Sequence, residues 1–209
     1  LKTSFEWRHK ILAAIRALEG GISFSGIVEA DELLMKYSEK GRKFKNKEEY
    51  QKAKKKKHPK VAVLVVTDRE GNLLFKQVGE IKVKNEQLRE ELKSRLSENN
   101  LICVKPKKEF RKAVKSLQSK KVIVNKRQIK RGIYSVKIVE NKISDFRTWL
   151  SRFHGVATKY LQSYLMWFVI MNKYLKELID SDIGRLLNLS SHDRWAWDKY
   201  REIVSQKYE

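Results

Sequence analysis

The sequence predicts an α/β fold in which a mixed β-sheet is flanked by helices, with helical additions at both ends. Between residues 27 and 124, apolar runs typical of strands alternate with segments of helical spacing, in the order strand, hairpin, helix, strand, helix, strand. The hydrophobic fraction of 41% over 209 residues is sufficient for a packed core. Many α/β folds share this order, so the order alone does not choose among them.

The N-terminal part begins with a predicted helix over residues 4–18, because its apolar residues recur at helical spacing and Gly20-Gly21 can end it. Residues 27–35 predict a strand with Glu29, Asp31 and Glu32 near its middle. Residues 36–60 hold many cations and few apolar residues, which favours an exposed loop.

The elements of the central part follow from shorter patterns. Residues 61–67 and 73–78 predict a hairpin closed by the turn 68–72; helices over 85–96 and 110–117 alternate with strands over 101–104 and 122–124. From residue 143 the apolar spacing is helical, with a break at Gly155, and the tail from residue 180 is expected to be helical. We expect three parts: a helical segment over 1–26, the sheet domain over 27–178 and a helical tail over 179–209.

The charge of the chain points to a polyanionic partner. Lys and Arg number 47 against 25 Asp and Glu, a formal net charge of +22. Such an excess binds nucleic acids by releasing their counterions, although composition does not separate DNA from RNA, and basic proteins in general carry similar charge. Two clusters are the predicted contacts, to phosphates rather than to bases: Lys54, Lys55, Lys56 and Lys57, then Lys126, Arg127, Lys130 and Arg131.

Cysteine content and hydropathy indicate the cellular compartment of the protein. The single cysteine, Cys103, lies in an apolar run, which excludes an internal disulfide and a multi-cysteine zinc ribbon within the sequence and predicts a buried thiol. No apolar stretch approaches the roughly 18–20 residues of a membrane span, and no signal-peptide pattern is present. We expect a cytoplasmic protein with no membrane partner.

Several sequence blocks identify a family. The segments TSFEWRHKILAAI, GIVEADE with a downstream KGRK, RGIY and FHGVATKYLQSYLMWF occur in this order. Together they resemble the ISXO group of DDE-type insertion-sequence transposases, over most of the chain from Thr3 to about Phe168. The resemblance implies a ribonuclease H-like domain in which three side chains bind two magnesium ions that activate a water or a DNA end for attack on a phosphodiester. Magnesium prefers hard oxygen ligands, which suits carboxylates in this role.

The resemblance assigns the site residues one by one. The first acid corresponds to Asp31, and the third position to Glu140 or Asn141, of which Glu140 is favoured as catalytic and metal-binding residue. The second acid is replaced by Lys105, and Ser135 stands where a histidine commonly follows the tyrosine. An ammonium has no lone pair for a metal and repels one, so the acid triad is degenerate. We predict that the Lys105 ammonium faces Asp31 and Glu140 and supplies positive charge in place of metal ions.

The other acids have structural explanations. By strand alternation Glu29 shares the face of Asp31 and Glu32 points away, although such a trio is also typical of a solvated edge. Asp68 lies in the predicted turn, and turn chemistry alone explains an aspartate there.

Three functions fit these observations. The first is a transposase-derived DNA-binding protein with impaired or lost strand-transfer catalysis, acting as a homo-oligomer or a subunit of a larger assembly. The alternative is an active magnesium-dependent DDE transposase that cuts and joins DNA, against which Lys105 argues. The third is an RNA-binding protein, which the charge allows and the family blocks do not favour.

Overall fold

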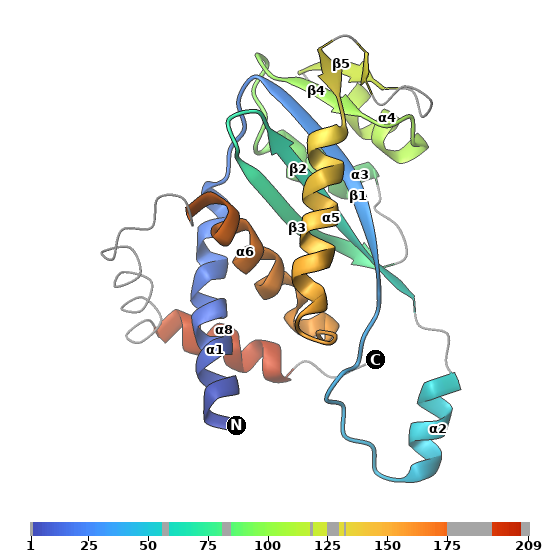
Figure 1. Ribbon diagram of the computed structural model, residues 1–209, viewed down its shortest axis with the longest axis vertical. Helices are drawn as coiled ribbons and strands as arrows, with labels where there is room; N and C mark the ends of the chain where they lie inside the picture. The colour runs from blue at the N-terminus through green and yellow to red at the C-terminus, as the bar shows by residue number, and fades with distance from the viewer. Residues whose placement is uncertain are drawn as a thin grey trace.

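The fold is built around one five-stranded mixed sheet. The computed structural model describes residues 2–55, 59–80, 85–117, 119–124, 130–131, 133–174 and 194–205. The strands are β1 (Ile27–Lys36), β2 (Lys60–Asp68), β3 (Leu73–Glu80), β4 (Leu101–Val104) and β5 (Lys120–Ile123), in the spatial order β3-β2-β1-β4-β5 (Figure 1). β1, β2 and β3 pair antiparallel, whereas β4 pairs parallel to β1 and β5 parallel to β4. The predicted mixed sheet is confirmed.

The strand pattern follows from burial on both faces of the sheet. β2 is a continuous apolar run that is buried from Val61 to Asp68, as expected for a strand covered on both sides. The predicted turn between β2 and β3 contains Gly71 at φ 92°, a left-handed conformation that glycine adopts without strain. Asp68 accepts hydrogen bonds from the backbone N–H and side-chain amide of Asn72, at 2.9 and 2.7 Å, and from the backbone N–H of Ser25 at 3.0 Å. Asp68 is therefore a turn residue, as its sequence context indicates.

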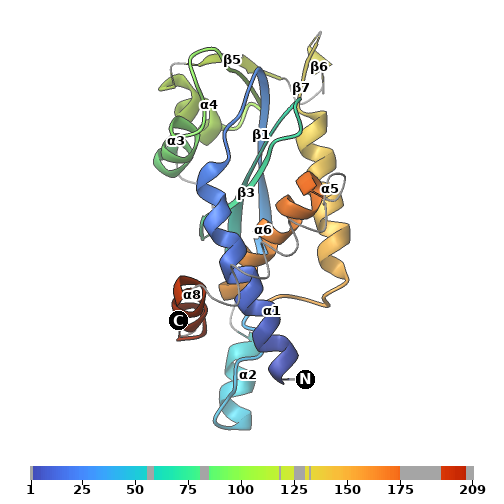
Figure 2. The same cartoon turned by 90° about the vertical axis from the view of Figure 1, so that its left-hand side faces the viewer.

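The chain forms helices on both faces of the sheet, seen edge-on in Figure 2. In chain order the described helices are α1 (Lys2–Ile15), the 3-10 helix η1 (Arg16–Gly21), α2 (Lys47–Lys55), α3 (Asn85–Lys93), α4 (Lys108–Lys115), α5 (Lys137–Ser151), α6 (Thr158–Tyr174) and α8 (Arg194–Ser205). A small antiparallel pair, β6 (Lys130–Arg131) and β7 (Tyr134–Ser135), precedes α5. The break predicted at Gly155 is confirmed, since α5 and α6 flank it.

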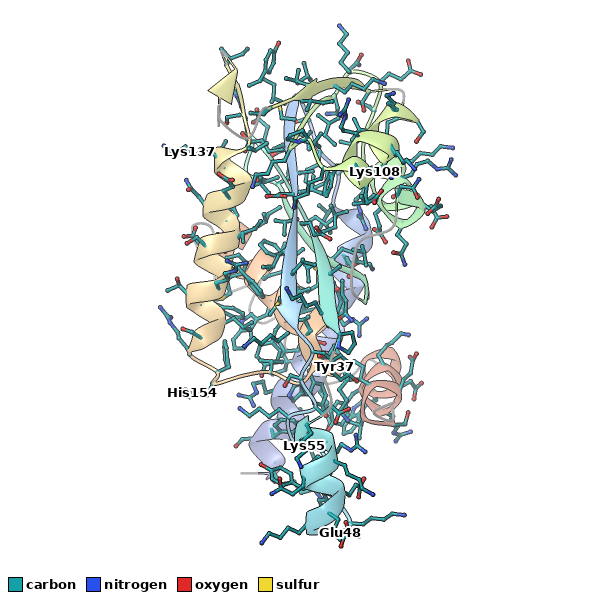
Figure 3. The ribbon with its side chains drawn as sticks, turned by 90° about the vertical axis from the view of Figure 1, so that its right-hand side faces the viewer. Tyr37, Glu48, Lys55, Lys108, Lys137 and His154 are labelled. Atoms are coloured by element: carbon teal, nitrogen blue, oxygen red, sulfur yellow. The ribbon has the colours of Figure 1, made fainter. Side chains whose placement is uncertain are left out.

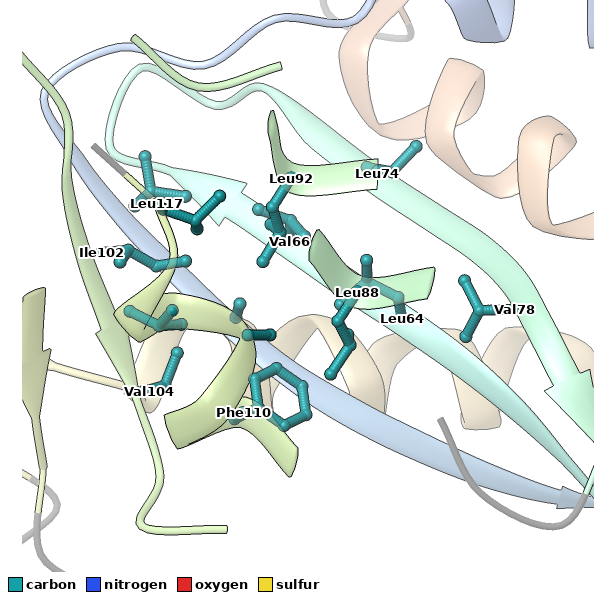
Figure 4. Packing of buried hydrophobic residues seen from close by; sticks show 14 of the residues in the cluster. Leu64, Val66, Leu74, Val78, Leu88, Leu92, Ile102, Val104, Phe110 and Leu117 are labelled. Atoms are coloured by element: carbon teal, nitrogen blue, oxygen red, sulfur yellow. The ribbon is translucent and has the colours of Figure 1, made fainter. Parts of the chain in front are cut away.

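Two hydrophobic clusters fix the helices to the sheet. On one face α3 and α4 contribute Leu88, Leu92 and Phe110, which pack with Val28 and Ala30 of β1 (Figure 4). On the other face, α5 and α6 pack with alternate strand residues; this second cluster includes Leu33, Val63, Phe75, Phe146, Leu161 and Leu165. β1 therefore sends its even-numbered residues to α3 and α4 and its odd-numbered residues to α5 and α6.

A third cluster, here called the terminal cluster, joins both ends of the chain. Leu12 and Ile15 of α1 pack with Tyr164 and Ile170 of α6 and with Ile203 of α8. None of the helices in the described parts of the chain combines the length and the hydropathy needed to cross a membrane.

One prediction for this part was wrong. Residues 36–60 are not a loop throughout, because β1 extends to Lys36 and α2 occupies Lys47–Lys55, away from the sheet (Figure 1). A side-chain cap explains this helix better than burial does: Asn46 Oδ1 accepts the Glu49 backbone N–H at 2.8 Å, and Glu48 and Glu49 lie in the first turn.

Candidate functional site

The site is centred on Asp31, at the point where β1 loses one of its neighbours. β4 pairs with β1 only from Ile27 to Ala30, opposite Leu101 to Val104. The chain leaves the sheet directly after Val104, so Lys105 and Lys107 lie beside the exposed edge of β1 at Asp31. Asp31 itself is buried, with 4% of its surface accessible.

Two lysines hold the Asp31 carboxylate. Lys105 Nζ lies 2.6 Å from Asp31 Oδ2 and 2.5 Å from Glu140 Oε1, so one ammonium contacts both predicted acids. Lys107 Nζ lies 2.8 Å from Asp31 Oδ1 and 3.5 Å from Glu32 Oε2. Lys107 can reach acids on both faces of β1 because none of the described strands pairs with that edge beyond Ala30. The predicted position of the Lys105 ammonium agrees with this geometry.

The surroundings of Asp31 and Lys105 favour the charged form of each side chain. Burial raises the pKa of Asp31, but hydrogen bonds from Lys105 and Lys107 and from the Glu32 backbone outweigh it, and the net pKa is below its usual value. Burial likewise lowers the pKa of Lys105, and the hydrogen bonds to Asp31 and Glu140 more than reverse this. Lys105 therefore carries its positive charge at neutral pH.

Glu140 and Asn141 lie near the start of α5 and differ in their surroundings. Glu140 lies in the first turn of α5 and reaches Lys105, whereas Asn141 is exposed. The structure brings Glu140 together with Asp31 through Lys105. The catalytic and metal-binding roles of both acids stay predictions.

Glu29 lies on the same face of β1 as Asp31 but has different hydrogen-bond partners. It is completely buried, and its carboxylate accepts hydrogen bonds from Ser135 Oγ at 2.7 Å and from the backbone N–H groups of Ile138 and Val139 at 2.8 and 3.1 Å. These N–H groups belong to the first turn of α5, where a negative charge is stabilised by the helix dipole. The alternative of a solvated acidic edge is wrong for Glu29 and Asp31, since the helix and the lysines cover them.

Cys103 is buried on the strand next to Glu29. Burial and the negative charge of Glu29 raise the pKa of its thiol to about 11. The thiol is therefore protonated at neutral pH, and the predicted buried cysteine is confirmed.

The donor set does not fit a pair of divalent metal ions. Within the described ranges, no group of three or more His, Cys, Asp or Glu side chains could hold a metal ion. Magnesium needs several oxygen ligands around it, and here the place between Asp31 and Glu140 is taken by an ammonium that contacts both. The Lys105 ammonium would also repel a metal ion placed beside these two carboxylates.

The predicted nucleic-acid contacts are only partly described. Lys54 and Lys55 lie on α2, and Lys55 is exposed. Lys130 and Arg131 form β6. Lys56, Lys57, Lys126 and Arg127 lie outside the described residues.

One cationic surface was missed in the sequence. Lys108, Arg111, Lys112 and Lys115 lie on one face of α4 and line a cavity of about 270 Å³ together with Pro106, which stands between Lys105 and Lys107 in the sequence. We call these four residues the α4 stripe (Figure 3 labels Lys108). The signal was present in the sequence, because the four cations have the spacing i, i+3, i+4, i+7 of one helix face.

Comparison with known proteins identifies the family. The family model described as ISXO2-like transposase domain matches residues 23–170. Among solved structures, a chain in the crystal structure of a pre-cleavage Mos1 transpososome is similar at 12% identity and a TM-score of 0.38; the alignment covers 100% of this chain and 65% of that chain. Comparison with curated proteins gives no match. Since the family model covers well over half of the sequence, the chain belongs to the ISXO2-like transposase domain family.

Proposed function

We propose that this transposase-family protein binds DNA and has impaired or lost strand cleavage and transfer. The observation that carries the proposal is the Lys105 ammonium in contact with both Asp31 and Glu140. DDE transposases are generally dependent on divalent metal ions. A lysine in place of a carboxylate removes one metal ligand and adds repulsion, and where metal ions carry the transition-state charge such a change costs orders of magnitude in rate.

DNA binding is supported by the distribution of charge. The chain has a formal charge of +22, and the α4 stripe gathers four cations on one helix face that begins three residues after Lys105. The clusters around Lys54–Lys57 and Lys126–Arg131 are proposed further contacts to phosphates. We also propose a cytoplasmic protein that acts as a homo-oligomer or within a larger assembly, with the sheet domain over 27–178 between its two helical additions.

An active metal-dependent transposase is the second candidate. Its support is that Asp31 and Glu140 converge on a single cation, so the two carboxylates are close enough to share one. For this candidate a metal ion must displace Lys105, whose side chain is 25% exposed.

Manganese binding distinguishes the two candidates without knowledge of the DNA sequence. We expect the wild-type protein to show no Asp31-dependent Mn²⁺ binding by electron paramagnetic resonance or calorimetry. Lys105→Asp should create such binding, and adding Asp31→Ala should remove it again. Lys108→Asp is the matched control, since it changes the same charge on the neighbouring helix and lies outside the carboxylate pair.

Cleavage of labelled DNA in Mg²⁺ or Mn²⁺ is the companion assay. Cleavage that the wild type performs and Asp31→Ala loses would overturn the proposed loss of catalysis. Competition between DNA and RNA of the same length checks the partner, and a preference for RNA would count against a DNA-binding role.

A further inference from the structure

A second cavity lies at the end of α5 that is remote from the Lys105 site. It has a volume of about 560 Å³, which is in the range of small-molecule sites. Its walls come from α1, from the turn after β1 at Lys40 and Gly41, from the connection between α5 and α6, and from the start of α6. Figure 3 shows His154 of this connection at the far end of α5 from Lys137. From Glu140 to Ser151 the helix axis rises roughly 17 Å, so the cavity is separate from the Lys105 site.

The cavity is lined by cations from four segments of the chain. Arg8, Lys40, Arg152 and Lys159 line it, and none of the described residues that line it is acidic. Lys40 Nζ donates to the carbonyls of Phe153, His154 and Gly155, at 3.3, 2.9 and 2.9 Å, and so holds the wall in place. Arg8 and Arg152 are exposed and form no ion pair with the described residues. Two arginines therefore remain available to an anion.

Aromatic rings form the wall beside these cations. The rings of Phe5, His9 and Tyr160 form a triangular cluster, with centroid distances of 4.2 Å from His9 to Phe5, 4.1 Å from His9 to Tyr160 and 5.7 Å from Phe5 to Tyr160. Phe5 is 38% exposed, so part of its ring is open to solvent. The guanidinium carbon of Arg8 lies 5.6 Å from the Phe5 centroid. This wall can therefore contact a planar group through Phe5 and an anion through Arg8.

The field in this region is positive. Burial, together with Arg8 and Lys159, lowers the pKa of His9 to about 4, so His9 is neutral at pH 7 and packs as an uncharged ring against Phe5 and Tyr160. A bound anion would relieve the repulsion among these cations.

We propose that this cavity binds a nucleotide, with its phosphate on Arg8 and Arg152 and its base against the exposed ring of Phe5. Arginine pairs with phosphate through two parallel hydrogen bonds, and aromatic rings stack on any base. The nucleotide comes either from solution or from an unpaired end of a DNA strand, because both present the same groups. The inference does not depend on the proposed loss of catalysis.

Calorimetry on the full chain tests the chemistry. We expect deoxyadenosine monophosphate to bind more tightly than either inorganic phosphate or deoxyadenosine. Arg8→Gln and Arg152→Gln should each weaken its binding at least tenfold, the effect of losing one hydrogen bond to a charged group. Phe5→Ala should weaken the nucleotide and leave inorganic phosphate unchanged. The matched controls are Arg147→Gln, an exposed arginine on α5, and Trp7→Ala, an exposed ring on α1 outside the cavity.

A second measurement separates the two sources of the nucleotide. If the ligand is a strand end, a duplex with an unpaired overhang should bind at least tenfold more tightly than a blunt duplex, and Arg8→Gln should abolish the difference. If the ligand is a free nucleotide, the monophosphate binds and the overhang makes no difference. The proposal is overturned if neither the monophosphate nor the overhang binds preferentially, if inorganic phosphate binds as tightly as the nucleotide, or if the control variants weaken binding as much as the cavity variants.

Discussion

Lys105 and Lys107 lie two residues apart, share Asp31 and each contact a different second acid. Both contact Asp31, but Lys105 extends toward Glu140 on the α5 side of the sheet, whereas Lys107 extends toward Glu32. Five charges thus share one network with Asp31 at its centre, and the hydrogen bonds to the lysines lower its pKa despite burial. If either lysine is removed, Asp31 keeps the other lysine and the Glu32 backbone N–H as partners, so the loss of one ion pair need not unfold the protein.

His9 makes the stability of the protein sensitive to mild acid. Its pKa is lowered from 6.5 to about 4 by burial and by Arg8 and Lys159. Between these two pH values the unfolded chain binds a proton at His9 that the folded chain does not, so the free energy of unfolding falls as the pH is lowered through this window. The shift corresponds to about 3 kcal/mol as an upper limit.

The measurement is urea denaturation at pH 7 and pH 4 for the wild type and for His9→Phe, which keeps a ring in contact with Phe5 and Tyr160. We expect the wild type to lose more stability than the variant over this interval. Equal losses would show that His9 is protonated in the folded protein at a normal pKa.

At the scale of elements, the α4 stripe is predicted to set the salt dependence of DNA binding. Each phosphate that a cation neutralises contributes about −0.9 to the slope of log affinity against log salt. Arg111→Gln and Lys112→Gln should each reduce the magnitude of the slope by about 1 and weaken binding to all sequences alike. Filter binding or fluorescence anisotropy over a salt series measures this.

Arg147→Gln is the control for the stripe, because Arg147 is exposed on α5, on the other side of the sheet. If it lowers the slope as much as the α4 variants, the binding surface is not localised to α4.

The elements that the sequence predicts well are those whose pattern is local. The strands of the hairpin, the helices α3 and α4 and the break at Gly155 follow from hydrophobic spacing and turn residues. α2 was missed because its stability comes from the Asn46 cap rather than from apolar residues. The role of Glu29 was missed for a different reason: alternation places it on a face, but its partners at the start of α5 are more than 100 residues away.

The site was predictable only where the family resemblance supplied the positions. Lys105 beside Asp31 and Glu140 follows from that resemblance, whereas the contact of Lys107 depends on where β4 ends. The cavity proposed to bind a nucleotide had no sequence signal, because its walls come from α1, the turn after β1, the connection between α5 and α6 and the start of α6. No local spacing relates such segments.

At the scale of the whole molecule, the helical additions and the sheet share α6. Leu161 and Leu165 of this helix pack on the sheet, whereas Tyr164 and Ile170 pack in the terminal cluster. Lys10 Nζ also lies 3.0 Å from the centroid of the Trp197 ring, which joins α1 to α8. Because one helix belongs to both clusters, the ends of the chain and the sheet should unfold together.

Ile203 tests this coupling. It is 3% exposed in α8, so Ile203→Ala should lower the free energy of unfolding by about 2–4 kcal/mol through lost burial and a cavity. The neighbouring Val204 is 44% exposed, and Val204→Ala should change it by less than about 0.5 kcal/mol. If the molecule unfolds as one unit, Ile203→Ala shifts the single urea transition seen by circular dichroism and by tryptophan fluorescence equally. A separate early transition, with the main one unmoved, would mean that α1 and α8 unfold independently of the sheet.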